Sequence, residues 1–403
     1  MILKAAWVLP ISGAPLRDGY VQVAGDRIVA VGSAAELGAV SEAVTDLGAA
    51  VLMPGLVNPH THLELTCYAG RLKPEPLWDW FPKLVRLRRA RGQVEREQQG
   101  VQDGAWQSLR AGVTCVGDIT RRNLNSQVLR TIPVRKVCYV ELLSLADDPP
   151  RNPEELRAGV AEVMEDALLT VGLSPHAPYT VPMEQIAAAV ALAEELGRPW
   201  CTHWMETREE RAFLLGDTLA LPGYMRDLLA QCQLRSPGLS AVELLEQCRR
   251  GARPGLLAHF NYAQPGDAER LAQAGYSVVY CPRSHAFFGH APHPFRALLS
   301  AGVNVALATD SAASNENLAL LEEARFVWQN APDPPRAETL LRMATLDAAR
   351  ALGLHTRIGS LEVGKQADLI AFTRAGGVSD PAAWLVERAP APQQVWVAGQ
   401  RVI

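Results

Sequence analysis

Residues 54–66 read PGLVNPHTHLELT, and this stretch places two histidines one residue apart directly after an apolar run. Side chains two residues apart in a β-strand point to the same side of the sheet. His60 and His62 can therefore direct both imidazoles at one point, as a metal ion requires. Two surface histidines beside a turn would give the same short pattern, so the rest of the chain has to decide between these interpretations.

Eight short apolar runs alternate with longer helical stretches through the centre of the chain. The helical stretch 182–197, for example, ends in glycine, which is typical of helix C-caps. This alternation predicts a parallel sheet with helices outside it, and eight such units predict an α/β fold of the TIM-barrel, (β/α)8 type. The predicted strands are residues 55–60, 113–118, 136–141, 169–176, 199–203, 255–259, 276–281 and 304–310.

The two ends of the chain have a different pattern. Residues 21–32 and the C-terminal stretches 358–372 and 393–403 read as strand–turn–strand. We expect the terminal strands to pair as a small β-sandwich beside the barrel. The predicted domains are residues 1–54 for the first part of the sandwich, 55–355 for the barrel and 356–403 for the second part. A partly helical insertion, residues 207–250, is predicted over one rim.

The composition is that of an ordinary globular protein, with 48% hydrophobic residues, 20% charged residues and a net charge of −4 over 403 residues. No broad positive field is available for nucleic acid or an anionic membrane. No uninterrupted apolar run is long enough for a membrane span, and the N-terminus lacks a signal-peptide pattern. Seven scattered cysteines without a C-x-x-C pair favour a reduced, cytoplasmic setting. Because the charge and hydropathy patterns favour neither nucleic acid nor a membrane as partner, we expect a small-molecule partner.

Almost every predicted parallel strand ends in a polar or ionisable residue. The carboxyl ends of barrel strands share one face, where active sites form. The sequence therefore predicts a site on that face, with His60 and His62 on the first strand. The other strand-end residues are Asp118, Glu141, His176, His203, His259 and Asp310.

Structural roles compete with functional ones at these positions. A single histidine at a strand end is more often a hydrogen-bonded core residue than a metal ligand. Asp310 follows the apolar run VALAT, and a buried carboxylate without a partner costs several kcal/mol or becomes neutral. A metal ion is one partner that removes this cost, which favours a ligand role for Asp310.

Other polar residues have good structural explanations. Asp118 and Glu141 are expected to pair with nearby arginines, the candidates being Arg121, Arg122 and Arg135. A second histidine group follows the seventh predicted strand, and we expect it to line a loop rather than to form a second metal site. Its members are His285, His290 and His293.

At this point the chain resembles the amidohydrolase superfamily, in its mononuclear deaminase and chlorohydrolase branch. The matching stretches occur in family order and cover nearly the whole chain, including both ends. They are MPGLVNPHTHLELT, SLRAGVTCVGDIT, GLSPHAPYTV, THWMET, LLAHF, VVYCPRSH, AGVNVALATDSAASNENL and IGSLEVGKQADLIAF.

The resemblance implies one divalent metal, most simply zinc with iron as an alternative. The implied ligands are His60, His62, His203 and Asp310. Binuclear members of the family usually carry a lysine on the fourth strand, and LTVGLSPH has none. Cytidine-type deaminases are excluded, because Cys281 precedes Pro282 and no P-C-x-x-C motif follows the H-x-E of residues 62–64.

The resemblance also implies the chemistry. A catalytic zinc lowers the pKa of its bound water to about 7, and Asp310 would accept a proton from that water. Glu206, in an H-x-x-E motif with His203, resembles the residue that protonates the ring nitrogen beside the attacked carbon. His259 resembles the histidine that orients the water. The implied reaction is hydrolytic loss of ammonia from an amino-substituted aromatic ring.

The stretches SPHAPYT and CPRSH resemble the adenosine-derivative deaminases of this branch. Among these, the chain looks most like enzymes that act on 6-aminodeoxyfutalosine in a menaquinone pathway, with deaminases of S-adenosylhomocysteine or methylthioadenosine as alternatives. His285 stands where the family often has asparagine, and with Phe287 and Phe288 it suggests a modified pocket for the substrate tail. The implied substrate contacts are His176, Arg283, Ser284 and Glu64, although Glu64 could equally brace its loop.

Two rival functions stay open. A chlorohydrolase or aminohydrolase of s-triazines would use the same metal and the same framework residues. A non-catalytic scaffold would be expected to have lost a ligand or Glu206, and all of these residues are present. The oligomeric state is a separate question, and a homodimer is possible.

Overall fold

A computed structural model of the chain describes residues 1–38, 42–121, 123–144, 150–232, 234–249, 253–373 and 375–403. All eight predicted parallel strands are present, in two four-stranded parallel sheets. The first sheet contains β6 (Leu56–Thr61), β7 (Val113–Thr120), β8 (Arg135–Leu142) and β9 (Leu169–Pro175). The second contains β10 (Cys201–Trp204), β11 (Leu256–His259), β12 (Ser277–Tyr280) and β13 (Asn304–Leu307).

The two sheets meet at two seams. At the seam between β9 and β10, Leu173 and Trp200 form an isolated parallel bridge. At the seam between β13 and β6, the amide nitrogen of Asn58 donates to Thr309 Oγ1 at 2.7 Å, and the backbone N–H of Asp310 donates to the carbonyl of His60 at 3.2 Å. The fold is therefore of the TIM-barrel type, with its parallel strands divided into two hydrogen-bonded halves.

One apolar core lies between the two halves. It joins Val57 and Val137 of the first sheet to Leu256 and Ala306 of the second. The helix α14 (Leu346–Ala351) packs Ala348 into this core, and the carbonyl of its Asp347 accepts a hydrogen bond from Asn304 at the start of β13. The amino end of the strands is thus closed by α14, and the carboxyl end is left for a site.

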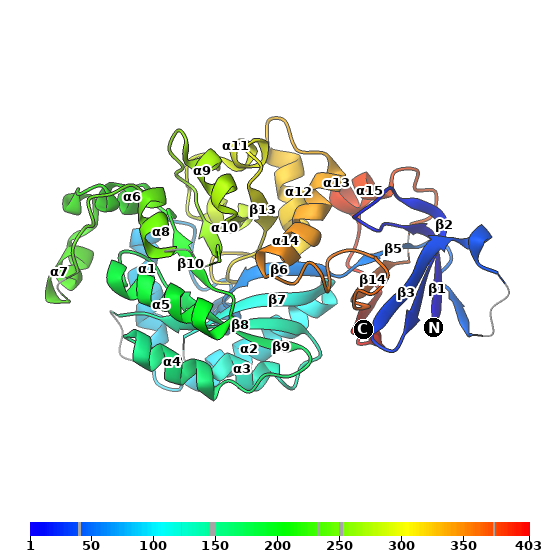
Figure 1. Cartoon of the computed structure of the whole chain (residues 1–403), viewed down its shortest axis with the longest axis horizontal. Helices are drawn as coiled ribbons and strands as arrows, with labels where there is room; N and C mark the ends of the chain where they lie inside the picture. Colours follow the sequence, from blue (N-terminus) through cyan, green and yellow to red (C-terminus); the bar gives the residue numbers. More distant parts are fainter. Residues whose placement is uncertain (39–41, 122, 145–149, 233, 250–252, 374) are drawn as a thin grey trace.

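Helices surround the parallel strands on the outside, as Figure 1 shows, and a second large core fills the space between the two layers. This arrangement follows the predicted alternation of apolar runs and helical stretches. The surrounding helices are α1 (Leu77–Arg88), α2 (Gln93–Arg110), α3 (Leu124–Leu129), α4 (Pro153–Glu162), α5 (Met183–Leu196), α9 (Asp267–Ala274), α10 (Pro282–Phe287), α11 (Phe295–Ser300), α12 (Leu320–Asn330), α13 (Ala337–Met343) and α15 (Pro381–Arg388).

The two ends of the chain form one mixed sheet of eight strands at the right of Figure 1. The predicted pairing of the ends is confirmed, because β5 runs antiparallel to β14 with Pro54 opposite Leu369. A division of this sheet into a two-layer sandwich stays a prediction. Its strands are β1 (Ile2–Val8), β2 (Leu16–Ala24), β3 (Arg27–Ser33), β4 (Val44–Asp46), β5 (Val51–Pro54), β14 (Leu369–Phe372), β15 (Gln394–Val397) and β16 (Gln400–Arg401).

Gly55 lies where the chain leaves the terminal sheet and enters the first parallel strand. A Cβ atom at this position would lie 2.0 Å from the hydroxyl oxygen of Thr114 on β7, which is far inside van der Waals contact. Only glycine lets the two backbones approach this closely. The start of β6, and with it the placement of His60, depends on this close approach.

The predicted insertion is helical. It contains α6 (Arg208–Leu214), the short 3₁₀ helix η3 (Thr218–Ala220), α7 (Gly223–Gln231) and α8 (Ala241–Arg249). In Figure 1, α6 and α7 lie at the end of the molecule opposite the terminal sheet. None of the helices in the described ranges combines the length and apolar character that a bilayer span needs.

Candidate metal centre and catalytic cavity

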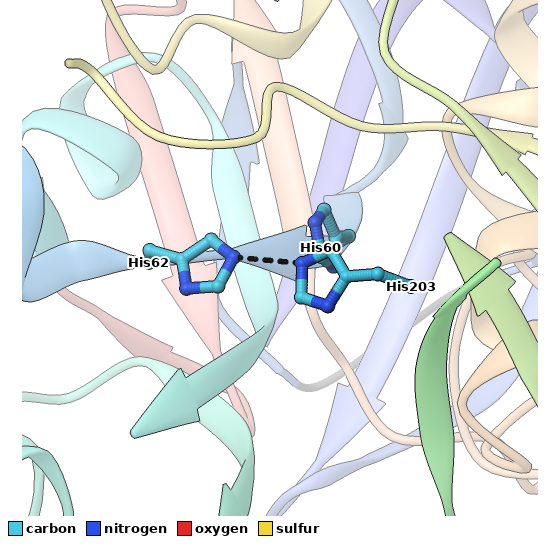
Figure 2. Close-up of side chains that lie close together, drawn as sticks. All are labelled: His60, His62 and His203. Atoms are coloured by element: carbon cyan, nitrogen blue, oxygen red, sulfur yellow. Dashed lines mark hydrogen bonds between the residues drawn. The ribbon is translucent and has the colours of Figure 1, made fainter. Parts of the chain in front are cut away.

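The four predicted ligands lie at the carboxyl ends of the parallel strands. His60 is in β6 and His62 follows that strand, whereas His203 is in β10 of the other sheet. Asp310 lies shortly after the end of β13. Figure 2 shows the rings of His60, His62 and His203 gathered at one place, with His62 and His203 facing each other. Strand geometry therefore brings together residues that are far apart in the sequence.

The donor atoms of these residues converge. Nε2 of His62 lies 3.2 Å from Nε2 of His203. Oδ1 of Asp310 lies 3.7 Å from Nε2 of His60 and 3.9 Å from Nε2 of His62. Two groups could each hold a metal ion, namely His60 with His62 and His203, and His60 with His259 and Asp310. The groups share His60, so together they describe one centre.

Burial keeps these imidazoles neutral. Desolvation lowers the pKa of His60, and it lowers the pKa of His62 and His203 to well below the usual value, with the neighbouring histidines adding to the effect. Both ring nitrogens of His60 and Nδ1 of His203 are buried without a hydrogen-bond partner in the described part of the chain. Neutral imidazoles and a carboxylate suit a borderline divalent ion such as zinc. The residues present therefore fit the implied metal.

Asp310 is oriented by two serines. The hydroxyl of Ser284 donates to Oδ2 of Asp310 at 2.7 Å, and that of Ser314 donates to the same oxygen at 3.4 Å. Oδ2 is thus occupied, and Oδ1 is the atom that lies near the histidines. Ser284, predicted as a substrate contact, is buried beneath Asp310 and does not line the cavity. Its hydroxyl holds the carboxylate in place.

Glu206 and His259 form a second pair beside the ligands. Oε1 of Glu206 lies 3.7 Å from Nε2 of His259, and both residues are buried. Burial raises the pKa of Glu206 well above its usual value, and the charges of Asp310 and Glu210 raise it further. Burial also lowers the pKa of His259 to well below its usual value. The pair therefore combines a carboxyl whose pKa is raised with an imidazole whose pKa is lowered, and both shifts favour the uncharged forms.

A large cavity of about 1180 Å³ opens onto this centre. His62, His203, Glu206, His259 and Asp310 lie on its wall. The rest of the wall comes mainly from α1, the segment that follows it, and α7 of the insertion. Aromatic and basic residues on the wall include Trp78, Trp80, Phe81, Tyr179, Tyr224, Phe288, Arg86, Arg88, Arg89, Arg91 and Arg121.

His176 lines the cavity, as its predicted contact with substrate requires. Its ring lies 4.6 Å from that of His203, centroid to centroid. Thr180 Oγ1 donates to the carbonyl of Ala177 at 3.0 Å, so this oxygen accepts the 2.7 Å hydrogen bond from Nδ1 of His176. Burial lowers the pKa of His176 to about 3. The Nε2 atom of this neutral ring is left with its lone pair.

Glu64 is part of a buried ion-pair network outside the main cavity. Its carboxylate lies 3.4 Å from NH2 of Arg88 and accepts a hydrogen bond from Asn125 at 2.9 Å. Arg88 is also bound to Glu97, at 3.0 Å from Nε to Oε1. Of the two roles open for Glu64, these contacts support bracing of the loop that follows His62.

Arg283, the other predicted substrate contact, is occupied by a different part of the chain. Its Nε donates to Oε1 of Glu323 at 2.7 Å, and its NH2 donates to the side chain of Asn317 at 3.0 Å. It does not line the cavity. The guanidinium instead ties the start of α10 to the start of α12.

The contacts that the structure gives Asp118 are hydrogen bonds, and its expected salt bridge stays a prediction because Arg122 lies outside the described residues. Oδ1 of its buried carboxylate accepts from the backbone N–H of Leu63 at 2.8 Å and from Thr61 at 3.0 Å, and Oδ2 accepts from Asn125 at 2.7 Å. Leu63 and Thr61 flank His62, so Asp118 fixes the backbone on either side of this predicted ligand.

Glu141 lies on the cavity wall, and of its expected arginine partners Arg135 is bound to Asp368 instead. Arg122 lies outside the described residues. Burial raises the pKa of Glu141 to about 7, against the opposing charges of Arg121 and Arg88. Glu141 is therefore a candidate substrate contact that the sequence reasoning missed.

The second histidine group does not line the cavity, and His285 lies in α10 instead of the expected loop, whereas His290 and His293 lie in the segment between α10 and α11. Nε2 of His293 donates to the carbonyl of His259 at 2.7 Å, and Nδ1 of His290 lies 3.2 Å from the hydroxyl of Tyr262. Of the three residues proposed to modify the tail pocket, Phe288 lines the cavity and His285 and Phe287 do not.

Arg88 and the aromatic wall were also missed by the sequence reasoning. Arg88 stands among several arginines in one helix, and no local pattern marks it as the one that lies between Glu64 and Glu97. Trp78 lines the cavity, and its ring lies 5.1 Å from that of Tyr179, centroid to centroid. The periodicity of hydrophobic residues in the sequence carries no information about such contacts between remote segments.

The chain is similar to known proteins in sequence and in fold. The sequence pattern of the amidohydrolase family matches residues 51–402. The chain is 31% identical, over 384 residues, to the 5-methylthioadenosine/S-adenosylhomocysteine deaminase of Moorella thermoacetica, which covers 92% of this chain and 85% of that protein.

Two solved structures share the fold. An adenosine deaminase from Xanthomonas campestris with bound zinc is 29% identical, with a TM-score of 0.83 over 99% of this chain and 92% of that chain. The Helicobacter pylori aminofutalosine deaminase in complex with methylthio-coformycin is 23% identical, with a TM-score of 0.85 over 100% of both chains. At that identity, the second likeness concerns the fold alone.

Proposed function

Because the chain belongs to the amidohydrolase family, we propose that it is a hydrolytic deaminase that releases ammonia from the adenine ring of a nucleoside derivative. One observation carries this proposal. A buried carboxyl of raised pKa, Glu206, lies 3.7 Å from the neutral imidazole of His259 on the wall of a cavity that also contains the metal-ligand group.

His60, His62, His203 and Asp310 would hold one divalent metal, with zinc as the expected ion. A zinc-type ion lowers the pKa of water and so supplies a nucleophile near neutral pH. The orphaned nitrogens of His60 and the free Oδ1 of Asp310 support this assignment. The zinc-containing Xanthomonas campestris enzyme supports the choice of metal.

The remaining chemistry falls to residues of the chain. Glu206 donates a proton to the ring nitrogen beside the carbon that carries the amino group, which makes that carbon electrophilic. Asp310 accepts a proton from the attacking water, and His259 hydrogen-bonds to the oxygen as it is added. The deprotonated Glu206 then takes the proton of the added hydroxyl and delivers it to the departing amino group, which gives ammonia and the oxo-substituted ring with its N–H. The proton held by Asp310 restores Glu206 for the next turnover.

The cavity wall supports a substrate with an extended tail on its sugar. Its volume exceeds the need of a bare nucleoside, since ordinary ligand pockets measure about 300–1,000 Å³. Aromatic residues such as Trp78 and Phe81 suit an aromatic group, and the exposed Arg86, Arg89 and Arg91 suit a carboxylate. Our first choice is therefore 6-aminodeoxyfutalosine, of menaquinone biosynthesis, which has an aromatic carboxylate tail.

Deaminases of S-adenosylhomocysteine or methylthioadenosine are the alternative that the Moorella thermoacetica relative supports. S-adenosylhomocysteine shares the carboxylate but lacks the aromatic ring, and methylthioadenosine lacks both. A preference among the three substrates therefore tests separate parts of the wall.

The proposal includes the architecture that carries the site. We infer that the two parallel sheets act as one closed barrel, with domain boundaries at 1–54, 55–355 and 356–403. The shared core that contains Val57 and Leu256 supports closure. The change of sheet at Gly55 supports the first boundary.

The test uses zinc-loaded protein and measures ammonia release from adenosine, S-adenosylhomocysteine, methylthioadenosine and 6-aminodeoxyfutalosine, and chloride release from a chlorinated s-triazine. We expect turnover of an adenine nucleoside, fastest for 6-aminodeoxyfutalosine, and its loss in Glu206→Gln. Chloride release from the triazine without ammonia from any nucleoside would replace the proposal with the chlorohydrolase function. Metal-loaded protein that is inactive on all five would favour a non-catalytic role.

A further inference from the structure

Two corners of the backbone carry the Glu206–His259 pair, and both have unusual geometry. Met205, next to Glu206, has a φ of 55°. His259 and Phe260 have φ values of 75° and 49°. Residues other than glycine seldom adopt this left-handed region, and such conformations persist only where surrounding contacts enforce them. The contacts that enforce these corners therefore also set the position of the pair.

The first set of contacts joins the corners to each other. Backbone N–H groups of Phe260 and Asn261 donate to the carbonyls of Trp204 and Met205, each at 2.9 Å. The side-chain amide of Asn261 donates to the carbonyl of Glu206 at 2.8 Å. These three hydrogen bonds join the backbone corner that follows β11 to the backbone corner that follows β10.

Glu210 supports the Glu206 corner from below. Its carboxylate accepts the backbone N–H of Met205 on one oxygen and that of Glu206 on the other, both at 2.8 Å. Glu210 has no exposed surface and does not line the cavity. It does not reach the substrate cavity, so it acts on Glu206, through these two backbone hydrogen bonds and through the charge that raises the pKa of Glu206.

His293 supports the His259 corner. Its Nε2 lies 2.7 Å from the carbonyl oxygen of His259. A carbonyl only accepts, so Nε2 is the protonated nitrogen of this ring. The ring is stacked on Tyr280, with centroids 4.0 Å apart, and is 8% exposed. A rigidly held donor therefore fixes the orientation of the carbonyl at the strained residue.

We propose that Glu210, Asn261 and His293 are positioning residues that hold the Glu206 carboxyl and the His259 imidazole at their working separation. None of the three lines the cavity. The kinetic part of this assignment rests on the proposed deaminase function. The structural part, the separation of Oε1 and Nε2, does not.

The sharpest test uses His293, for which the chain offers a rescue and a control. His293→Leu removes the donor, whereas His293→Gln retains an amide N–H₂ at the place of Nε2. His290→Leu removes a neighbouring histidine that contacts Tyr262 instead of the site. We expect kcat of His293→Leu to fall by about tenfold to a hundredfold, the loss typical of a misplacement of about 1 Å. KM and metal content should stay at wild-type values, and the Gln and His290→Leu variants should keep kcat within about threefold.

Equal losses in the Leu and Gln variants would show that ring packing on Tyr280 matters and hydrogen bonding does not, which would overturn the assignment for His293. Asn261→Leu and Glu210→Gln extend the test, and wild-type kcat in both would overturn it for the other two residues. Crystal structures of metal-loaded variants give a readout without activity. The wild-type separation of 3.7 Å should widen in His293→Leu and Asn261→Leu. An unchanged separation would refute positioning even if the deaminase proposal itself fails.

Discussion

Nε2 of His62 lies 3.2 Å from Nε2 of His203, although 141 positions separate the two residues in the sequence. Both rings are neutral at physiological pH, because burial lowers their pKa well below the usual value. Two neutral imidazole nitrogens at this distance need a proton or a cation between them. Without a metal, one ring can supply that proton as an N–H···N hydrogen bond, whereas a metal ion can bind the lone pairs of both rings, so a bound ion would add to the stability of the folded site.

Metal removal should consequently destabilise the protein. At a metal concentration 100 times Kd, binding contributes about 2.7 kcal/mol to the free energy of unfolding. Calorimetry should show a Tm that is several degrees lower after chelation and that is restored by zinc. His62→Asn should lose the bound metal and the zinc-dependent shift, whereas His290→Asn should keep both. A chelation-insensitive Tm in protein that demonstrably binds metal would contradict this expectation.

The pH dependence of catalysis should report Glu206. Burial, Asp310 and Glu210 all raise its pKa, so the protonated form that the mechanism needs persists above the usual range of a carboxyl. As pH rises through this raised pKa, the proton is lost and kcat/KM should fall. In Glu206→Gln, kcat should drop by roughly 10²- to 10⁴-fold, and any residual activity should lack this limb. The control variant Glu209→Gln, at the start of α6, should keep the wild-type dependence of kcat/KM on pH.

The stability of the protein should decrease with pH because of Glu141. Burial raises its pKa from 4.5 to about 7 in the folded state. Between these values the folded protein holds a proton that the unfolded chain releases, so unfolding becomes easier as pH rises. Full ionisation costs roughly 3 kcal/mol on this account.

Thermal unfolding at several pH values would measure the Glu141 effect. The Tm of Glu141→Gln minus the Tm of wild type should increase as pH rises from 4.5 to about 7. The exposed Glu154→Gln should show a constant difference from wild type over the same range. A constant difference for Glu141→Gln as well would mean that the carboxylate is ionised throughout.

The terminal sheet should depend on one buried ion pair with the barrel. Arg135 of β8 binds Asp368 through two hydrogen bonds of 2.8 and 3.0 Å, with side chains that are only 3% and 2% exposed. Removing one partner leaves a buried charge, so Arg135→Met and Asp368→Asn should each destabilise by about 3–5 kcal/mol.

A double-mutant cycle would measure this coupling, and the double variant should lose less than the sum of the single changes. Arg157 and Glu195 form a two-bond pair of similar geometry, at 2.9 and 2.6 Å, on the surface. The corresponding cycle on that pair should give less than about 1 kcal/mol. Equal coupling in the two cycles would show that burial does not strengthen the barrel contact.

Sequence reasoning located the elements of the site because strands obey local rules. Apolar runs with polar ends identified all eight parallel strands, and the strand-end rule brought His60, His203 and Asp310 to one face. The predicted pairing of the chain ends is likewise present in the contact of β5 with β14. Each of these features depends on a period or a boundary within a short window of sequence.

The roles of Ser284, Arg283 and Glu64 were harder to predict for a physical reason. The contacts of each side chain are made by a partner in a remote segment. Ser284 contacts Asp310, Arg283 contacts Glu323, and Glu64 contacts Arg88. Such pairings depend on how loops cross above the strands. No periodicity records them.

The left-handed corners also lie outside sequence rules. Met205, His259 and Asp310 adopt positive φ values of 55°, 75° and 58° without being glycine. Side-chain type therefore predicts the wrong backbone region for these three positions. Their conformations come from tertiary hydrogen bonds, which is why strain of this kind gathers at the site.

The division of the parallel strands into two sheets has a consequence for the assembly of the enzyme. His60 and His62 belong to the first half, and His203 and Asp310 belong to the second. Neither half alone contains all four proposed ligands, so an ion that binds all four would join the two halves. Metal uptake during refolding would then follow the formation of both halves. A chain in which only one half has folded would not bind the ion with all four ligands.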